Sequence, residues 1–188
     1  TGFLSELGVD AGHFWSQEVG PLLSQHDWDP VPAYLYQMIE LSRSGRHGLI
    51  TQERLAQWGR RLPLHDGVDT LFSRLRALVK AQHPQVQIEF YLISSGIGDV
   101  VRNTPIAHEF TDIWASEFMY GQDGGIHFPR RIVSFTDKTR YLFHIQKGIV
   151  GQASRNKPFE VNKKVDQDKL RVPFQQMIFV GDGYTDIP

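Results

Sequence analysis

The sequence predicts an α/β fold in which a small helical domain precedes a doubly wound parallel sheet. Residues 3–62 carry apolar side chains at three- and four-residue spacing, as amphipathic helices do. From residue 66 onward, continuous apolar runs alternate with amphipathic stretches, a pattern typical of parallel strands covered by helices on both faces. The change of pattern divides the chain into domains 1–65 and 66–188.

The first domain is expected to be a small helical bundle. Helical periodicity runs through residues 3–8, 13–25, 33–43 and 51–62, and Thr51 has a side chain suited to an N-cap. Most of the aromatic side chains on these stripes are expected to fill the core of the bundle, and about one in four to face a ligand: Phe14, Trp15, Tyr34, Tyr36 and Trp58.

The second domain begins with an amphipathic helix over 66–83, followed by an apolar strand over 86–94. A helix limited by Pro105 is expected over 98–110, and a strand over 112–120. A turn is expected over 121–125, and a helix over 139–148 that ends at Gly148. A polar segment over 151–172 and a last strand over 176–182 follow.

Polar residues and glycines follow two of the predicted strands, and ligands of parallel sheets bind beyond the carboxyl ends of strands. At the second of these ends, Asp182 lies between Gly181 and Gly183, and Asp186 follows four residues later. Their carboxylates suit a hard cation such as Mg²⁺. The alternative is that Asp182 caps a following helix and Asp186 lies in solvent.

The first strand end, "LISSGIG" (residues 92–98), offers the hydroxyls of Ser94 and Ser95 and the backbone at Gly96, which suit a phosphate group. Gly96 and Gly98 also have the spacing of a dinucleotide fingerprint, but Val101 stands at the third glycine position. A dinucleotide-dependent oxidoreductase therefore ranks far behind a phosphate-binding protein.

A third candidate is Lys138, at the head of a predicted helix. There, its ammonium group is able to pair with a phosphate dianion and with Asp186. The alternative is a surface lysine in contact with solvent.

The order of these features resembles the haloacid dehalogenase-like superfamily of phosphohydrolases, in its phosphoserine-phosphatase-like branch. The resemblance covers residues 66–188 and rests on Ser94 after one strand, Lys138 at a helix start, and "GDGYTD" with Asp182 and Asp186 after another strand. It implies a Rossmann-like core, and residues 1–65 would be the superfamily's variable helical cap.

The resemblance also implies a mechanism. An aspartate of a first motif attacks phosphorus to form an aspartyl-phosphate that water hydrolyses. Ser94, Ser95, Gly96 and Lys138 would hold the phosphoryl oxygens of a small phosphorylated metabolite, while Asp182 would bind Mg²⁺. Asp186 would orient Lys138 or the waters of the metal.

The first motif, an apolar strand followed by D-x-D, is not found in the sequence. Asp27 and Asp29 have the carboxylate spacing but follow a helical stripe, so we interpret them as a turn between helices. Asp137 precedes Lys138 in an order that would require a permuted chain. We therefore expect the chain to be part of a larger enzyme, incomplete at both ends, whose nucleophile lies upstream of Thr1.

Composition excludes several classes of protein. A net charge of −1 argues against a nucleic-acid partner, and the absence of cysteine excludes thiol nucleophiles and thiolate metal sites. No apolar run reaches the ~20 residues of a membrane helix, so we expect no membrane partner. We expect the protein to be cytoplasmic. Substrate identity and oligomeric state are left open.

The leading hypothesis is thus a Mg²⁺-dependent phosphatase acting on a small phosphorylated metabolite. The alternative is a non-catalytic member of the same superfamily, a binding or interaction module without the nucleophile.

Overall fold

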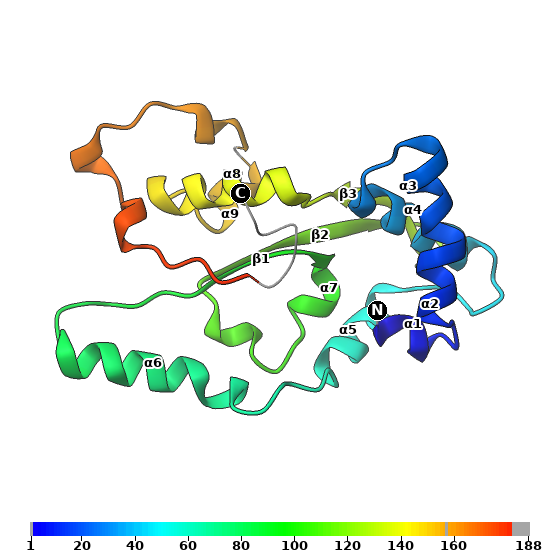
Figure 1. Cartoon of the computed structure of the whole chain (residues 1–188), viewed down its shortest axis with the longest axis horizontal. Coiled ribbons are helices and arrows are strands. Elements are labelled where there is room, and N and C mark those ends of the chain that lie inside the picture. Colours follow the sequence, from blue (N-terminus) through cyan, green and yellow to red (C-terminus); the bar gives the residue numbers. More distant parts are fainter. Residues whose placement is uncertain (1, 157, 182–188) are drawn as a thin grey trace.

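A computed structural model describes residues 2–156 and 158–181 of the chain (Figure 1). The helical part comprises α1 (Gly2–Glu6), α2 (Ala11–His13), the π-helix η1 (Phe14–Val19), α3 (Gly20–His26), α4 (Pro30–Arg43) and α5 (Gln52–Arg60). The later part comprises α6 (Val68–Gln82), β1 (Tyr91–Ile97), α7 (Gly98–Val101), η2 (Ala107–Glu109), β2 (Asp112–Tyr120), β3 (Ile126–Arg131), α8 (Phe135–Lys147), α9 (Gln152–Asn156), η3 (Pro158–Asn162), η4 (Gln167–Lys169) and η5 (Phe174–Gln176).

Local signals in the sequence set several helix ends where they were predicted. Thr51 caps α5, its side chain accepting a hydrogen bond from the backbone N–H of Arg54. Gly148 ends α8 in the left-handed conformation at φ 72°. Asp27 ends α3 with φ 55°, and Asp29 stands at the N-cap position of α4, which confirms the predicted turn between helices.

The three strands form a mixed sheet with the order β1-β2-β3. β1 and β2 run parallel, whereas β2 and β3 form an antiparallel hairpin over the predicted turn. The prediction of a doubly wound parallel sheet is therefore wrong. β3 was not predicted, because its sequence IHFPRR contains Pro129 and does not alternate cleanly; proline is tolerated in a strand at the edge of a sheet.

Three further elements differ from the prediction. The strand expected over 86–94 lies at Tyr91–Ile97, so Ser94, Ser95 and Gly96 lie within it. Residues 98–110 form only the short helices α7 and η2 instead of one helix, with Pro105 between them. Residues 177–181 form no strand, and Ile178 and Val180 are 92% and 88% exposed. An apolar run becomes a strand only where a neighbouring strand offers hydrogen-bonding partners, and none pairs with these residues.

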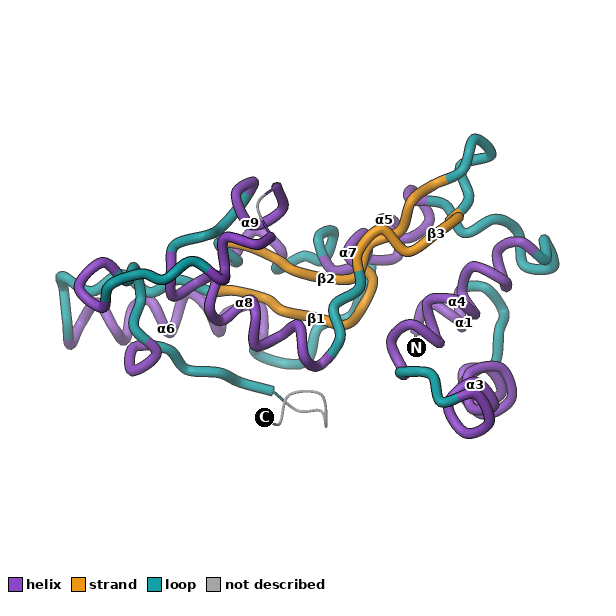
Figure 2. Tube along the Cα trace, turned by 90° about the horizontal axis from the view of Figure 1, so that it is seen from above, coloured by secondary structure: helices purple, strands orange, loops and turns teal. Residues whose placement is uncertain are grey.

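The main core joins the helical part to the sheet. Buried residues of α1 to α5 pack together with Val100 of α7, Phe118 of β2 and Ile126 of β3. Both views place α1–α5 at the end of the sheet where the β2–β3 hairpin lies (Figures 1 and 2). The helical part thereby lies next to the segment that follows β1.

A second, smaller core fixes α8 on the sheet. Trp114 of β2 stacks on Tyr141 of α8 at 4.9 Å between ring centroids, and Val133 and Ile145 complete this cluster. In contrast, the predicted apolar face of α6 is only partly covered: Phe72 is buried, while Leu71 is 43% exposed.

Candidate functional site

The candidate site is built on an irregularity at the carboxyl end of β1. Ile93 pairs with Trp114 and Ile97 pairs with Ser116, so that a four-residue step along β1 faces a two-residue step along β2. The additional residues of β1 lie between Ile93 and Ile97, where Ser94, Ser95 and Gly96 stand. Bulges of this kind redirect side chains and are frequent beside functional sites.

Ser94 is oriented by a local hydrogen bond. Its Oγ accepts from the backbone N–H of Gly96 at 3.0 Å, which leaves the hydroxyl proton to be donated elsewhere. A side chain at position 96 would place its Cβ 3.2 Å from this Oγ, closer than ordinary contact. Glycine at position 96 therefore keeps the turn around Ser94 compact.

Ser95 provides a second hydroxyl with different surroundings. Its Oγ is buried and has no hydrogen-bond partner among the residues that the structure describes. Leaving such a group unsatisfied costs about 1–3 kcal/mol, so a buried orphan of this kind is a candidate contact for a ligand or an ordered water. Its backbone carbonyl accepts a 2.5 Å hydrogen bond from the hydroxyl of Tyr34 in α4.

Tyr34 shows how the helical part takes part in the site. Burial raises the pKa of the Tyr34 hydroxyl far above its usual value, so it remains a neutral donor to Ser95. In the sequence, Tyr34 is one of several aromatic residues on a helical stripe and was assigned to the core. No local signal distinguishes it from the others, because its partner lies 61 residues further along the chain.

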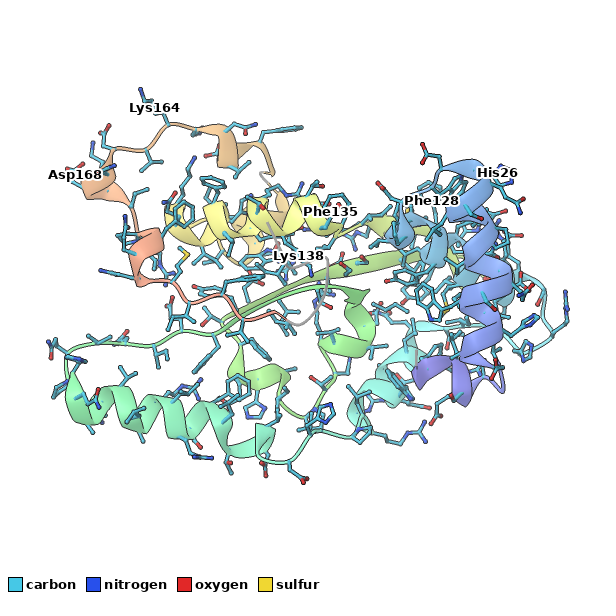
Figure 3. The ribbon with its side chains drawn as sticks, in the orientation of Figure 1. His26, Phe128, Phe135, Lys138, Lys164 and Asp168 are labelled. Atoms are coloured by element: carbon cyan, nitrogen blue, oxygen red, sulfur yellow. The ribbon has the colours of Figure 1, made fainter. Side chains whose placement is uncertain are left out.

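Lys138 is buried at 7% exposure in the first turn of α8. It stands three and seven residues before Tyr141 and Ile145, which pack on the sheet, so it lies on the same helix face. The first turn of α8 lies near the end of the sheet where β1 has its carboxyl end (Figures 1 and 3). Lys138 is therefore not a surface lysine in contact with solvent.

The predicted metal ligands Asp182 and Asp186 lie outside the described residues. Neither the expected ion pair with Lys138 nor the expected proximity of Asp182 to Ser94 is therefore tested. Within residues 2–156 and 158–181, no group of three His, Asp or Glu side chains is arranged to hold a metal ion.

The alternative nucleophiles have structural roles. Asp137 forms a capping box with Ser134, since its Oδ2 accepts from the Ser134 backbone N–H at 3.1 Å and from its hydroxyl at 2.9 Å. Its Oδ1 pairs with Arg140 at 3.2 Å. Both oxygens of this carboxylate are engaged, which leaves it poorly placed to attack a substrate.

Sequence reasoning missed a polar network beside the site. Asp99, in the first turn of α7, accepts hydrogen bonds from Tyr120 at 2.6 Å and from Gln52 at 2.9 Å. Burial, followed by the bond to Asp99, raises the pKa of Tyr120. The three side chains line a cavity of about 500 Å³ between α5 and α7. They come from three distant segments, so no sequence spacing announces them.

Comparison with known proteins gives a distant relative and no family. A protein of Borreliella burgdorferi described as uncharacterized is 25% identical over an alignment 203 positions long, which covers 97% of this chain and 68% of that protein. No protein-family model matches the chain, and no solved structure does. The part of the chain that the structure describes contains no helix of the length and apolarity needed to cross a membrane.

Proposed function

We propose that this chain binds the phosphate group of a small phosphorylated metabolite as part of a Mg²⁺-dependent phosphohydrolase of the haloacid dehalogenase type. The observation that carries the proposal is the pairing of two features: the serine bulge at the carboxyl end of β1, and a buried lysine in the first turn of the helix packed on that strand. Their order along the chain agrees with the resemblance noted from the sequence.

The chemistry of these groups supports an anionic ligand. The hydroxyls of Ser94 and Ser95 are donors with capacity left, and the buried ammonium group of Lys138 offsets negative charge. The N-terminus of α8 adds its partial positive charge. Together, these groups would hold phosphoryl oxygens and stabilise charge that develops on them during transfer.

Mg²⁺ would neutralise the charge of the transferred group when bound. The described residues alone do not form a site for it, and its proposed ligands Asp182 and Asp186 lie beyond them. No step is therefore assigned to the metal. A cytoplasmic location also stays a prediction.

The second candidate is a phosphate-binding module without catalysis. It is favoured by the positions of the three aspartates considered as nucleophiles. Asp27 and Asp29 lie at helix ends, and Asp137 is held in a capping box. Such a protein would retain the phosphate contacts of Ser94 and Lys138 and lack the attacking carboxylate.

Binding and turnover are tested separately. Phosphate binding is measured by calorimetry with inorganic phosphate, with and without Mg²⁺, for the wild-type chain and for Ser94→Ala and Lys138→Met. We expect each substitution to weaken binding at least tenfold, while Lys164→Met, at an exposed position well away from the site, leaves it unchanged (Figure 3). Equal affinity in all four proteins would refute the proposed site.

Turnover is followed with para-nitrophenyl phosphate, with Mg²⁺ or with a chelator. We expect no hydrolysis by the 188-residue chain, because Asp137 is held in the capping box, while Asp27 and Asp29 stand at exposed helix ends in the helical part. Hydrolysis that disappears in Asp137→Asn would show that the nucleophile lies in this chain after all. In an active longer form, Asp182→Asn is expected to weaken Mg²⁺ binding, since an amide is a poorer ligand than a carboxylate.

A further inference from the structure

A second cavity lies on the outer face of α8, away from the serine bulge. It measures about 420 Å³, within the range of small-molecule sites. One wall consists of Thr136, Thr139, Arg140 and Phe143, which share a helix face because they are spaced by three, one and three residues. Lys138, Tyr141 and Ile145 occupy the opposite face, toward the sheet, so this cavity is distinct from the candidate phosphate site.

The other wall is the segment that follows α9, with Phe159, Val161 and Asn162. Lys147, in the last turn of α8, holds this segment in place by donating to the carbonyls of Val161 at 2.5 Å and Lys163 at 2.7 Å. In Figure 1, the segment passes over α8, in agreement with the contacts between α8 and η3. The cavity is therefore an open one, bounded on two sides by elements that the protein ties together.

The lining combines aromatic surface with one cation. Phe159 is 81% exposed and Phe143 37% exposed, so each has ring surface available to a ligand. Large exposed aromatic side chains gathered around a cavity are unusual unless something covers them. Aromatic rings of a ligand would pack on them in stacked or edge-on geometry.

Arg140 is the charged residue that lines this cavity. Its Nη2 donates to the Tyr141 hydroxyl at 2.9 Å and lies 3.2 Å from Oδ1 of Asp137. Among the described residues, its Nε has no hydrogen-bond partner. The guanidinium, on a side chain that is 35% exposed, thus has N–H donors left for a ligand.

We propose that this cavity binds a small aromatic acid, with the ring between Phe143 and Phe159 and the acidic group on Arg140. The hydroxyls of Thr136 and Thr139 and the amide of Asn162 offer additional hydrogen bonds around the acid. Planar, paired N–H donors make arginine well suited to a carboxylate or a phosphate, and an aromatic body accounts for the two exposed rings. The site is independent of phosphate hydrolysis.

The test uses 2-naphthoate as the probe, followed by its own fluorescence during titration with the 188-residue chain. Its neutral analogue 2-naphthylmethanol tests whether binding needs the negative charge. Cyclohexanecarboxylate, measured by its competition with 2-naphthoate, tests whether binding needs an aromatic ring. We expect saturable binding of 2-naphthoate, with both analogues at least tenfold weaker.

Variants locate the binding. Phe159→Ser is expected to lower the affinity for 2-naphthoate at least fivefold, and Arg140→Gln to lower it at least tenfold. Phe128→Ser, which removes another exposed phenylalanine on β3, is the matched control and should bind as the wild type does (Figure 3). Since Arg140 also contacts Tyr141, its variant counts only if its thermal unfolding matches the wild type; otherwise Phe159→Ser decides.

Three results would overturn the proposal. They are the absence of saturable 2-naphthoate binding, equal binding of 2-naphthylmethanol, and unchanged affinity in Phe159→Ser. An equal loss in Phe128→Ser would likewise show that the probe binds exposed rings without regard to this cavity.

Discussion

Gly59 offers the sharpest test of how the helical part is joined to the segment behind β1. A Cβ built at Gly59 in α5 would lie 2.3 Å from the carbonyl oxygen of Val100 in α7 and 3.0 Å from Cβ of Asn103. Ordinary van der Waals contact begins at 3.4 Å, so Gly59→Ala would force α5 and α7 apart by roughly 1 Å. The hydrogen bond between Gln52 and Asp99 joins the same two helices and would lengthen.

The expected cost follows from two opposing terms. Overpacking costs about 1–3 kcal/mol, and we take the upper part of this range because the obstacle is backbone and cannot rotate away. Alanine within a helix is favoured over glycine by about 1 kcal/mol. Gly59→Ala should therefore destabilise the protein by about 1–2 kcal/mol, which lowers Tm by roughly 2–8 °C for a chain of this size.

Thermal and urea unfolding, followed by circular dichroism, measure this loss. Gly12→Ala in α2 is the matched control, because its Cβ would meet only a carboxylate oxygen of Asp10 at 3.3 Å. It should gain helix propensity and keep or raise the stability. If Gly59→Ala proves as stable as Gly12→Ala, the close approach of α5 and α7 does not exist in solution.

Two further predictions concern acid stability and association. Hydrogen bonding from Arg171 lowers the pKa of Glu89 in the folded protein. The ionised carboxylate therefore stabilises the fold fully above the pKa that Glu89 has in the unfolded chain. This stabilisation is lost as the pH falls through the lower pKa of the folded protein. Glu89→Gln should flatten the acid limb of unfolding free energy against pH, and an unchanged limb would contradict the assignment. Because Ile178 and Val180 are exposed while β1 lies at the edge of the sheet, concentrated protein should self-associate. Val180→Lys should reduce the associated fraction in light scattering without lowering Tm; equal association would show that other surfaces are responsible.

The elements predicted correctly depend on neighbouring residues. Thr51 caps α5, Gly148 ends α8, and the apolar run 112–120 forms β2. Caps and helical periodicity involve residues within one or two turns, so the sequence states them directly. The serines at the end of the first apolar run and the lysine at a helix start were found in the same way.

The sequence by itself thus determined the longer helices, the ends of helices at Thr51 and Gly148, and the two apolar runs that form the parallel strand pair. It also determined the residue types available for an anion. Only the tertiary structure decided which strands pair: the run at 177–181 has the composition of a strand but no partner, whereas β3 forms despite Pro129 because β2 offers it an antiparallel edge. It also decided the bulge at Ser94, the bond from Tyr34 to Ser95 and the burial of Lys138. The physical reason is that pairing, register and burial depend on contacts between residues far apart in the chain, and these are settled by the packing of the whole molecule.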